Sequence, residues 1–217
     1  MAEHHFGDGA QGLEGLSDRA CDRTELADYA QSRLGSLTMG KPRIDIHVDE
    51  STGRWTVDAL PMILVPQHFF LNNHYAVEKA LGAAELERIL RPAGYRSAHF
   101  WCQKEAEFHK LTGEQVLRHY LKRLSQRGWA QFHIEDFNQH RGTAGIVVRN
   151  SAMIDPSYVH QKRKCCYMFA AWFEGAFDYV AKDEGLSFHE AKEVYCAAEG
   201  EHDHCRFAVS LRQGKGS

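Results

Sequence analysis

The sequence predicts an α+β domain in which an antiparallel sheet packs against several helices. Segments that alternate apolar and polar residues occur in pairs joined by short turns, a pattern typical of antiparallel hairpins. Segments with apolar residues at helical spacing lie between these pairs. No regular strand–helix–strand alternation is visible, so the helices and hairpins are expected to form a mixed fold rather than a parallel sheet.

Composition indicates one ordinary globular domain with a tail. The chain has 217 residues, of which 43% are hydrophobic and 25% charged, so it can bury a core of normal size. Residues 1–40 are rich in Gly, Asp, Ser and Ala and contain few large apolar residues. We therefore expect residues 1–40 to form a mobile N-terminal tail and residues 41–217 to form a single domain.

The first elements of the domain are a hairpin and two helical segments. Residues 43–60 alternate in polarity on both sides of "STG", which predicts a hairpin. Within residues 63–82 the pattern becomes helical, and Gly82 is expected to end this helix. Residues 83–111 have helical spacing, and Pro92 is expected to kink or divide that helix.

Residues 112–128, "TGEQVLRHYLKRLSQRG", predict a clean amphipathic helix. Thr112 is the expected N-cap and Gly128 ends the helix. The apolar stripe consists of Val116, Leu117, Tyr120, Leu121 and Leu124.

The last part of the chain predicts two hairpins around a buried helix. Residues 129–138 and 142–151 form the first strand pair, and residues 188–200 and 204–212 form the closing pair. Between them, residues 165–185 are apolar or aromatic on most faces, so this helix should be buried.

Charge and hydropathy argue against two classes of partner. The formal net charge of −3 gives no broad attraction to nucleic acid or to an anionic membrane. The longest apolar run, Leu60 to Val65, is far shorter than the roughly 20 residues that span a bilayer. The N-terminus lacks a basic segment followed by an apolar one, so we expect no signal peptide and a cytoplasmic location.

The segment "EVYCAAEGEHDHCRFAV" gathers possible metal ligands near the end of the chain. If its two ends pair as strands, Cys196 and Cys205 come close together, with Glu193 beside them, and a third thiolate can come from Cys165 or Cys166. Three sulfurs and one carboxylate would give the closed four-ligand shell of structural zinc.

Other interpretations of this segment remain open. His202 or His204 could replace Glu193 in the shell, and an unrelated pair of cysteines would show the same pattern.

Motifs for catalysis are absent from the sequence. There is no G-x-S-x-G, C-x-x-C, H-E-x-x-H or Walker A loop. His99, Cys102 and Glu105 at helical spacing could gather a thiol near a base. The competing interpretation is a partly exposed helix with scattered polar residues, and no catalytic residue is assigned.

The stretches "CYMFAAWFEGAFDYV" and "EVYCAAEG…HCRFAV" resemble the 4-vinyl reductase domain family, which includes the sensor domains of phenol- and toluene-type transcriptional activators. "VVRNS" and "RPAGYRSA" resemble further motifs of that family. The resemblance implies an α+β fold shared with vesicle-tethering subunits and with NO-signalling and Golgi-transport ligand-binding domains. It also implies a homodimer and a zinc site formed by Cys166, Glu193, Cys196 and Cys205. Because this chain ends without a basic helix-turn-helix, we expect a stand-alone domain.

The resemblance also implies a buried pocket for a small organic ligand. Leu117 and Val148 occupy positions where the aromatic sensors are expected to carry a histidine and a tryptophan, so phenol is not the expected ligand. Ordinary core packing is the competing explanation for the aromatic residues. The candidate lining residues are Phe69, Phe70, Phe100, Trp101, Leu117, Tyr120, Val148, Phe169 and Trp172.

The sequence thus predicts a zinc-containing small-molecule-binding domain that acts as a sensor or carrier. One alternative is an enzyme, or an essential accessory protein, in the reduction or processing of a small organic substrate. Another is a dimeric assembly module without a ligand.

Overall fold

The computed structural model describes residues 44–154 and 162–212, which group into one compact unit. The tail predicted for residues 1–40 lies outside the described residues. The elements are β1 (His47–Asp49), β2 (Arg54–Val57), β3 (Leu60–Met62), α2 (Gln67–Leu81), α3 (Ala83–His109), α4 (Glu114–Gln126), β4 (Gln131–Asn138), β5 (Thr143–Arg149), α5 (Met168–Val180), β6 (His189–Tyr195) and β7 (Cys205–Leu211), with short 3₁₀ turns at Lys182–Glu184 and Ala197–Glu199.

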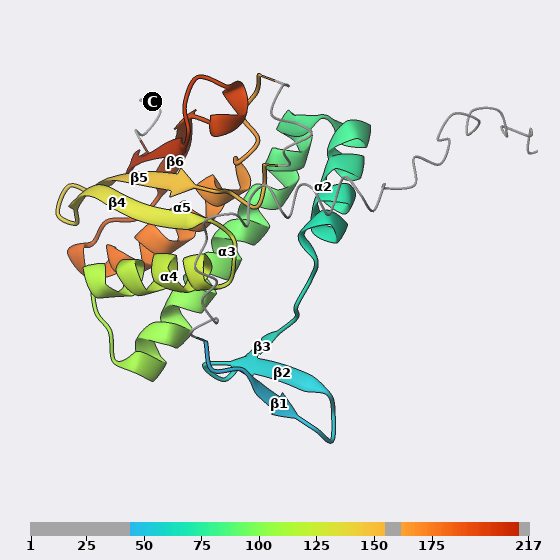
Figure 1. Cartoon of the computed structure of the whole chain (residues 1–217). Coiled ribbons are helices and arrows are strands. Elements are labelled where there is room, and N and C mark those ends of the chain that lie inside the picture. Colours follow the sequence, from blue (N-terminus) through green and yellow to red (C-terminus); the bar gives the residue numbers. More distant parts are fainter. Residues whose placement is uncertain (1–43, 155–161, 213–217) are drawn as a thin grey trace, which may run out of the picture. The chain divides into compact units, whose positions relative to one another are not determined.

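A four-stranded antiparallel sheet in the order β4-β5-β7-β6 forms the centre of the unit. Helices α3, α4 and α5 lie on one side of this sheet (Figure 1). Alternate residues of β7, namely Cys205, Phe207 and Val209, are buried and join the core, whereas the residues between them are more exposed. This one-sided burial is what an antiparallel sheet covered by helices requires, and it confirms the predicted α+β class.

The predicted N-terminal hairpin is present and carries a third strand. Strands β1, β2 and β3 form a separate antiparallel sheet. Asp58 and Ala59 turn the chain between β2 and β3 with φ of 51° and 62°. Two consecutive residues with positive φ are typical of the tight hairpin turns that match the twist of their strands.

Helices α3 and α5 cross in close contact at a glycine. A Cβ atom on Gly175 of α5 would lie 2.2 Å from the backbone oxygen of Tyr95 on α3. Because that oxygen belongs to a helix backbone, it cannot move aside as a side chain would. The central glycine of the aromatic helix therefore sets the distance between the two helices.

The predicted division of a helix at Pro92 and the predicted N-cap Thr112 were wrong. Pro92 does not divide its helix, because α3 continues from Ala83 to His109 through it. Packing against α5 holds this stretch helical even though Pro92 cannot donate the usual hydrogen bond. The N-cap of α4 is Gly113, with φ of 52°, rather than Thr112. Glycine can adopt this left-handed entry into the helix, which threonine disfavours.

Within the described residues, we find no helix with the length and apolar character needed to cross a membrane.

Candidate metal centre

Four predicted ligands come from three separate parts of the chain and meet beneath one end of the sheet. Cys166 precedes α5, Glu193 lies on β6, Cys196 directly follows β6, and Cys205 opens β7. One donor atom from each of these residues lies within 4.8 Å of the others. The structure therefore brings together the four residues that the family resemblance implied.

A bulge in β6 places Glu193 and Cys196 on the same face of the sheet. Glu193 is opposite Phe207 and Tyr195 is opposite Arg206, so Val194 is an extra residue in the ladder. Side chains three positions apart in a regular strand point to opposite faces, but one inserted residue restores them to the same face. Phe207 is fully buried, so the face that Glu193 and Cys196 share is the core face.

The three sulfur atoms are spaced as zinc ligands are. The Sγ atom of Cys205 lies 3.5 Å from that of Cys196 and 3.7 Å from that of Cys166, and the remaining pair is 4.0 Å apart. Tetrahedral zinc with Zn–S bonds of about 2.3 Å separates its sulfur ligands by about 3.8 Å. The donor set and its dimensions fit zinc.

Neighbouring groups orient the thiols. The Ser151 hydroxyl lies 3.1 Å from Cys166 Sγ, and the backbone N–H of Ala197 donates to Cys205 Sγ at 3.3 Å. The backbone N–H of Cys196 donates to the Glu199 carboxylate at 2.7 Å, which fixes the 3₁₀ turn after β6. Such outer contacts are what orient the ligands in known metal sites.

The electrostatics of the group favour a cation. Both carboxylate oxygens of Glu193 are buried and have no hydrogen-bond partner among the described residues. Burial, and then the negative charge of Cys196, raise the pKa of Glu193 to about 9. Hydrogen bonds from the Cys165, Cys166 and Cys205 thiols lower the pKa of Cys196. A buried carboxylate beside a stabilised thiolate is costly unless a positive charge accompanies them.

Three nearby residues lie outside this four-residue group. Cys165 Sγ reaches Cys196 Sγ at 3.8 Å but is not among the four mutually close donors. His204 uses both ring nitrogens, with the Tyr195 hydroxyl at 2.8 Å and Asp203 at 2.6 Å. The ring of His202 lies 4.0 Å from that of Tyr195. Neither histidine takes the place of Glu193.

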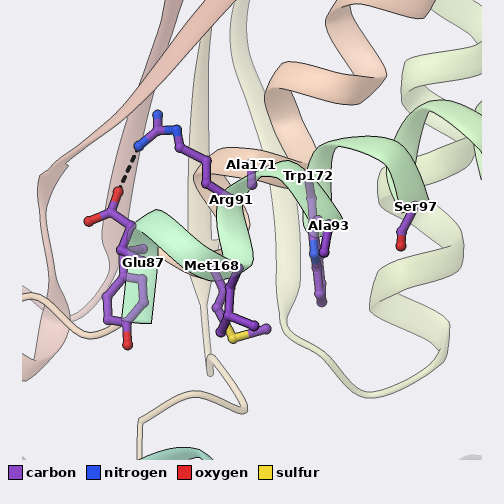
Figure 2. Close-up of a pocket in the computed structure, with 10 residues that line it drawn as sticks. Glu87, Arg91, Ala93, Ser97, Met168, Ala171 and Trp172 are labelled. Carbon is purple, nitrogen blue, oxygen red and sulfur yellow. Dashed lines mark hydrogen bonds and ion pairs between the residues drawn. The ribbon is translucent and has the colours of Figure 1, made fainter. Parts of the chain in front are cut away.

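A cavity of about 200 Å³ lies between α3 and the start of α5, and Figure 2 shows its lining. Apolar groups from both helices form most of its wall, with Glu87 and Arg91 at one side. Tyr167 and Met168, which directly follow Cys166, also line it. The lining residues are Glu87, Leu90, Arg91, Ala93, Gly94, Ser97, Tyr167, Met168, Ala171 and Trp172.

The candidate ligand-pocket residues are not gathered around this cavity. Trp172 lines it, whereas the residues Phe69 and Phe100 are 60% and 52% exposed. The others belong to the closed core or pack on its edge, so their role in ligand binding stays a prediction. These core and edge residues are Phe70, Trp101, Leu117, Tyr120, Val148 and Phe169.

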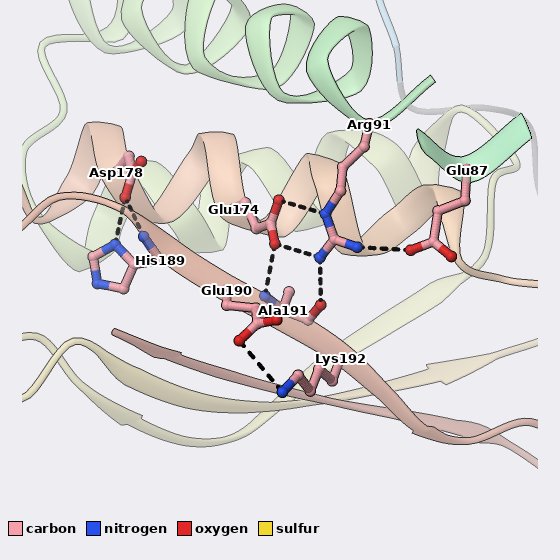
Figure 3. A network of polar contacts seen from close by, with 8 residues as sticks. All are labelled: Glu87, Arg91, Glu174, Asp178, His189, Glu190, Ala191 and Lys192. Atoms are coloured by element: carbon pink, nitrogen blue, oxygen red, sulfur yellow. Dashed lines mark hydrogen bonds and ion pairs between the residues drawn. The ribbon is translucent and has the colours of Figure 1, made fainter. Parts of the chain in front are cut away.

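A polar clamp beside the cavity was not predicted from the sequence (Figure 3). The guanidinium of Arg91 donates to the Glu174 carboxylate at 2.5 and 3.1 Å and to the backbone oxygen of Ala191 at 2.9 Å. The same carboxylate accepts the backbone N–H of Ala191 at 3.0 Å. One ion pair thus connects α3, α5 and β6. An arginine before a proline and a glutamate in an aromatic helix give no sequence signal that they meet.

The helical group His99, Cys102 and Glu105 does not assemble as a thiol beside a base. The His99 ring packs between Tyr95 and Tyr179, and Glu105 instead meets His119 from α4. Burial raises the pKa of the Cys102 thiol, which makes it a poor nucleophile.

Comparisons with known proteins bear on the fold. Residues 40–135 match a family described as "Domain of unknown function (DUF5943)". No curated protein matches the chain. The phenol-responsive sensory domain of the transcription activator PoxR, solved with phenol, is similar in structure with a TM-score of 0.63 and 15% identity, over 88% of this chain and 90% of that chain. This similarity shows a shared fold.

A trafficking protein particle complex subunit 3 from Naegleria fowleri, covalently bound to palmitic acid, gives a TM-score of 0.47 and 13% identity. It covers 68% of this chain and 95% of that chain, and the agreement is too weak to support an argument.

Proposed function

We propose that this chain is a small-molecule-binding sensor or carrier domain of the 4-vinyl reductase kind, with a structural zinc ion. The observation that carries the metal proposal is the buried, unpartnered carboxylate of Glu193 beside three sulfurs at zinc-ligand spacing. Zinc would supply the positive charge that this group lacks. Four protein ligands leave no open position for water, so the ion would stabilise the fold rather than catalyse hydrolysis.

The ligand site that we propose is the cavity between α3 and α5. An apolar cavity of about 150 Å³ holds benzene in another protein, so a cavity of about 200 Å³ is large enough for a single-ring organic molecule. The PoxR domain binds phenol. Apolar groups form most of the wall of this cavity, which favours an apolar single-ring ligand over phenol.

The metal and the cavity share the start of α5. Cys166 would be held by zinc, and the next two residues, Tyr167 and Met168, line the cavity. A ligand that shifts α5 would therefore act on a helix whose first turn is fixed to β6 and β7. This arrangement suits a sensor, whereas the closed four-ligand shell argues against the alternative of a metal-dependent enzyme.

Metal analysis of the purified full chain tests the zinc site. We expect about one zinc per chain bound with thiolate ligands, and loss of that zinc in the double variant Cys196→Ser/Cys205→Ser. Because metal binding is linked to folding, the double variant should melt lower by on the order of 10 °C. Cys102→Ser, which removes a buried thiol outside the group, should keep the zinc. Thiolate-bound zinc retained in the double variant would refute the site.

Binding of toluene as a single-ring probe tests the cavity. Ala93 lines the cavity from an exposed position on α3, so Ala93→Leu should fill the space without disturbing the core. We expect at least a tenfold loss of toluene affinity, measured by calorimetry, with zinc content unchanged. Arg96→Leu on the same helix lies outside the lining and is the matched control. Equal binding by wild type and Ala93→Leu would place the ligand elsewhere.

A further inference from the structure

A second group of metal-ligating side chains lies at the end of α3 and on α4. Glu105 and His109 are four residues apart on α3, so they share one face of that helix. His119 reaches them from α4. None of these residues belongs to the cysteine group or lines the cavity between α3 and α5.

The donor atoms are close enough to share one ion. Glu105 Oε2 lies 2.7 Å from His119 Nε2 and 3.4 Å from His109 Nε2, and all three donors lie within 4.8 Å of one another. An ion with bonds of about 2.0–2.1 Å holds its ligand atoms about 2.9–3.4 Å apart. Modest movement of the two rings would therefore accommodate the ion.

A second, independent observation concerns unsatisfied polar atoms in this group. Glu105 is completely buried, and its Oε1 atom has no hydrogen-bond partner among the residues described. His109 Nε2 is also buried and makes no hydrogen bond to any residue that the structure describes. Leaving a carboxylate oxygen and a ring nitrogen unsatisfied is expensive, and a shared cation would satisfy both.

The charged groups around the cluster balance one another. Asp58, in the turn between β2 and β3, pairs with Arg123 at 2.8 Å and lies 3.6 Å from His109 Nε2. Arg123 Nε is 4.0 Å from Glu105, and Arg127 lies over the Trp101 ring at 5.2 Å. The two arginines oppose a cation and the two carboxylates favour it. We therefore expect weaker binding here than at the cysteine group.

We propose that Glu105, His109 and His119 form a second metal site, which takes a divalent first-row transition metal with open coordination positions. Two imidazoles and one carboxylate suit zinc, iron or nickel and leave room for water or an exogenous ligand. The histidine side chains are 29% and 18% exposed, so an ion can enter from solvent. This site would differ in chemistry from the closed, sulfur-rich group.

Cobalt(II) titration of the metal-free full chain separates the two sites. We expect two equivalents to bind in wild type: one with a thiolate-to-cobalt charge-transfer band and one without it. His109→Gln and Glu105→Gln should each weaken the equivalent without the band by at least about 100-fold, because loss of a direct ligand costs no less than loss of an outer contact. Both variants should keep the thiolate band, which also reports that they are folded.

The matched control is His133→Ala, an exposed histidine on β4 that should bind both equivalents as wild type does. Absence of the second equivalent in wild type, or its full retention in His109→Gln and Glu105→Gln, would overturn the proposal. Loss in the His133→Ala control would equally overturn it, since the binding would then be unspecific. In the Cys196→Ser/Cys205→Ser background the second equivalent should persist, so failure of the zinc proposal is distinguishable from failure of this one.

Discussion

At the residue scale, hydrogen-bond partners decide whether the pKa of a buried carboxylate is raised or lowered. Glu193 has no hydrogen-bond partner among the described residues and its pKa is raised to about 9. Asp178 accepts hydrogen bonds from the backbone N–H of His189, from the ring of His189 and from the Tyr95 hydroxyl. Burial by itself would raise the pKa of Asp178, but these hydrogen bonds lower that pKa below its ordinary value. The fold itself therefore stabilises the charged form of Asp178, whereas Glu193 keeps its proton at pH 7 unless a cation binds beside it.

Asp178→Asn should lower the free energy of unfolding by about 2–3 kcal/mol at pH 7, since hydrogen bonds to a charged acceptor are lost. A carboxylate whose pKa is lower in the folded than in the unfolded protein stabilises the fold at pH values above its unfolded pKa. It loses this contribution as the pH falls through its folded pKa. The difference in free energy of unfolding between wild type and Asp178→Asn should thus shrink below about pH 3.8. Urea unfolding at pH 7, 5 and 3 measures it. Asp183→Asn, at an exposed position, should show no such difference, and a pH-independent gap at Asp178 would contradict the prediction.

At the scale of the elements, α5 is held by contacts of three kinds. Gly175 allows close approach to α3, and the Arg91–Glu174 pair ties α5 to α3 and β6. The Cys166 thiol, just before α5, contacts the thiols of Cys196 after β6 and Cys205 at the start of β7. Each contact joins segments far apart in the sequence. The position of α5 therefore depends on several partners at once, which suits a helix that lines the cavity.

Arg91→Ala should destabilise the domain by about 3 kcal/mol, because it leaves the Glu174 carboxylate, only 4% exposed, without its cation. Equilibrium unfolding in urea measures the change. The matched control is Arg88→Ala on the same helix, where the Arg88–Glu85 pair is exposed and no measurable change is expected. In a double-mutant cycle with Glu174→Gln the two changes should not add; simple additivity would show that the pair is not coupled.

At the scale of the whole molecule, the described unit has apolar side chains that nothing within it covers. Ile63 and Leu64, between β3 and α2, are 82% and 80% exposed, and Phe69 on α2 is 60% exposed. A contiguous exposed apolar segment is typical of a surface that associates with another chain. We expect a second copy of this chain to cover it, in keeping with the predicted homodimer.

If the chain dimerises as expected, Ile63→Ser/Leu64→Ser should make it monomeric, as measured by sedimentation velocity over a range of concentrations. Phe188→Ser removes another exposed apolar side chain, away from this segment in sequence, and should leave the dimer intact. A wild-type chain that is monomeric at high concentration would contradict the expectation. So would a double variant that dimerises as the wild type does.

The sequence by itself determined the α+β class, most element positions and the four members of the cysteine group, because apolar periodicity, turn residues and a recognisable motif are local properties. Tertiary structure alone decided the continuity of α3 through Pro92, since packing against α5 outweighed a local helix-breaking tendency. It also decided the Arg91–Glu174 clamp and the meeting of Glu105 with His109 and His119. These groups come together through helix crossings, and neither spacing nor composition along one chain specifies which faces of two helices meet.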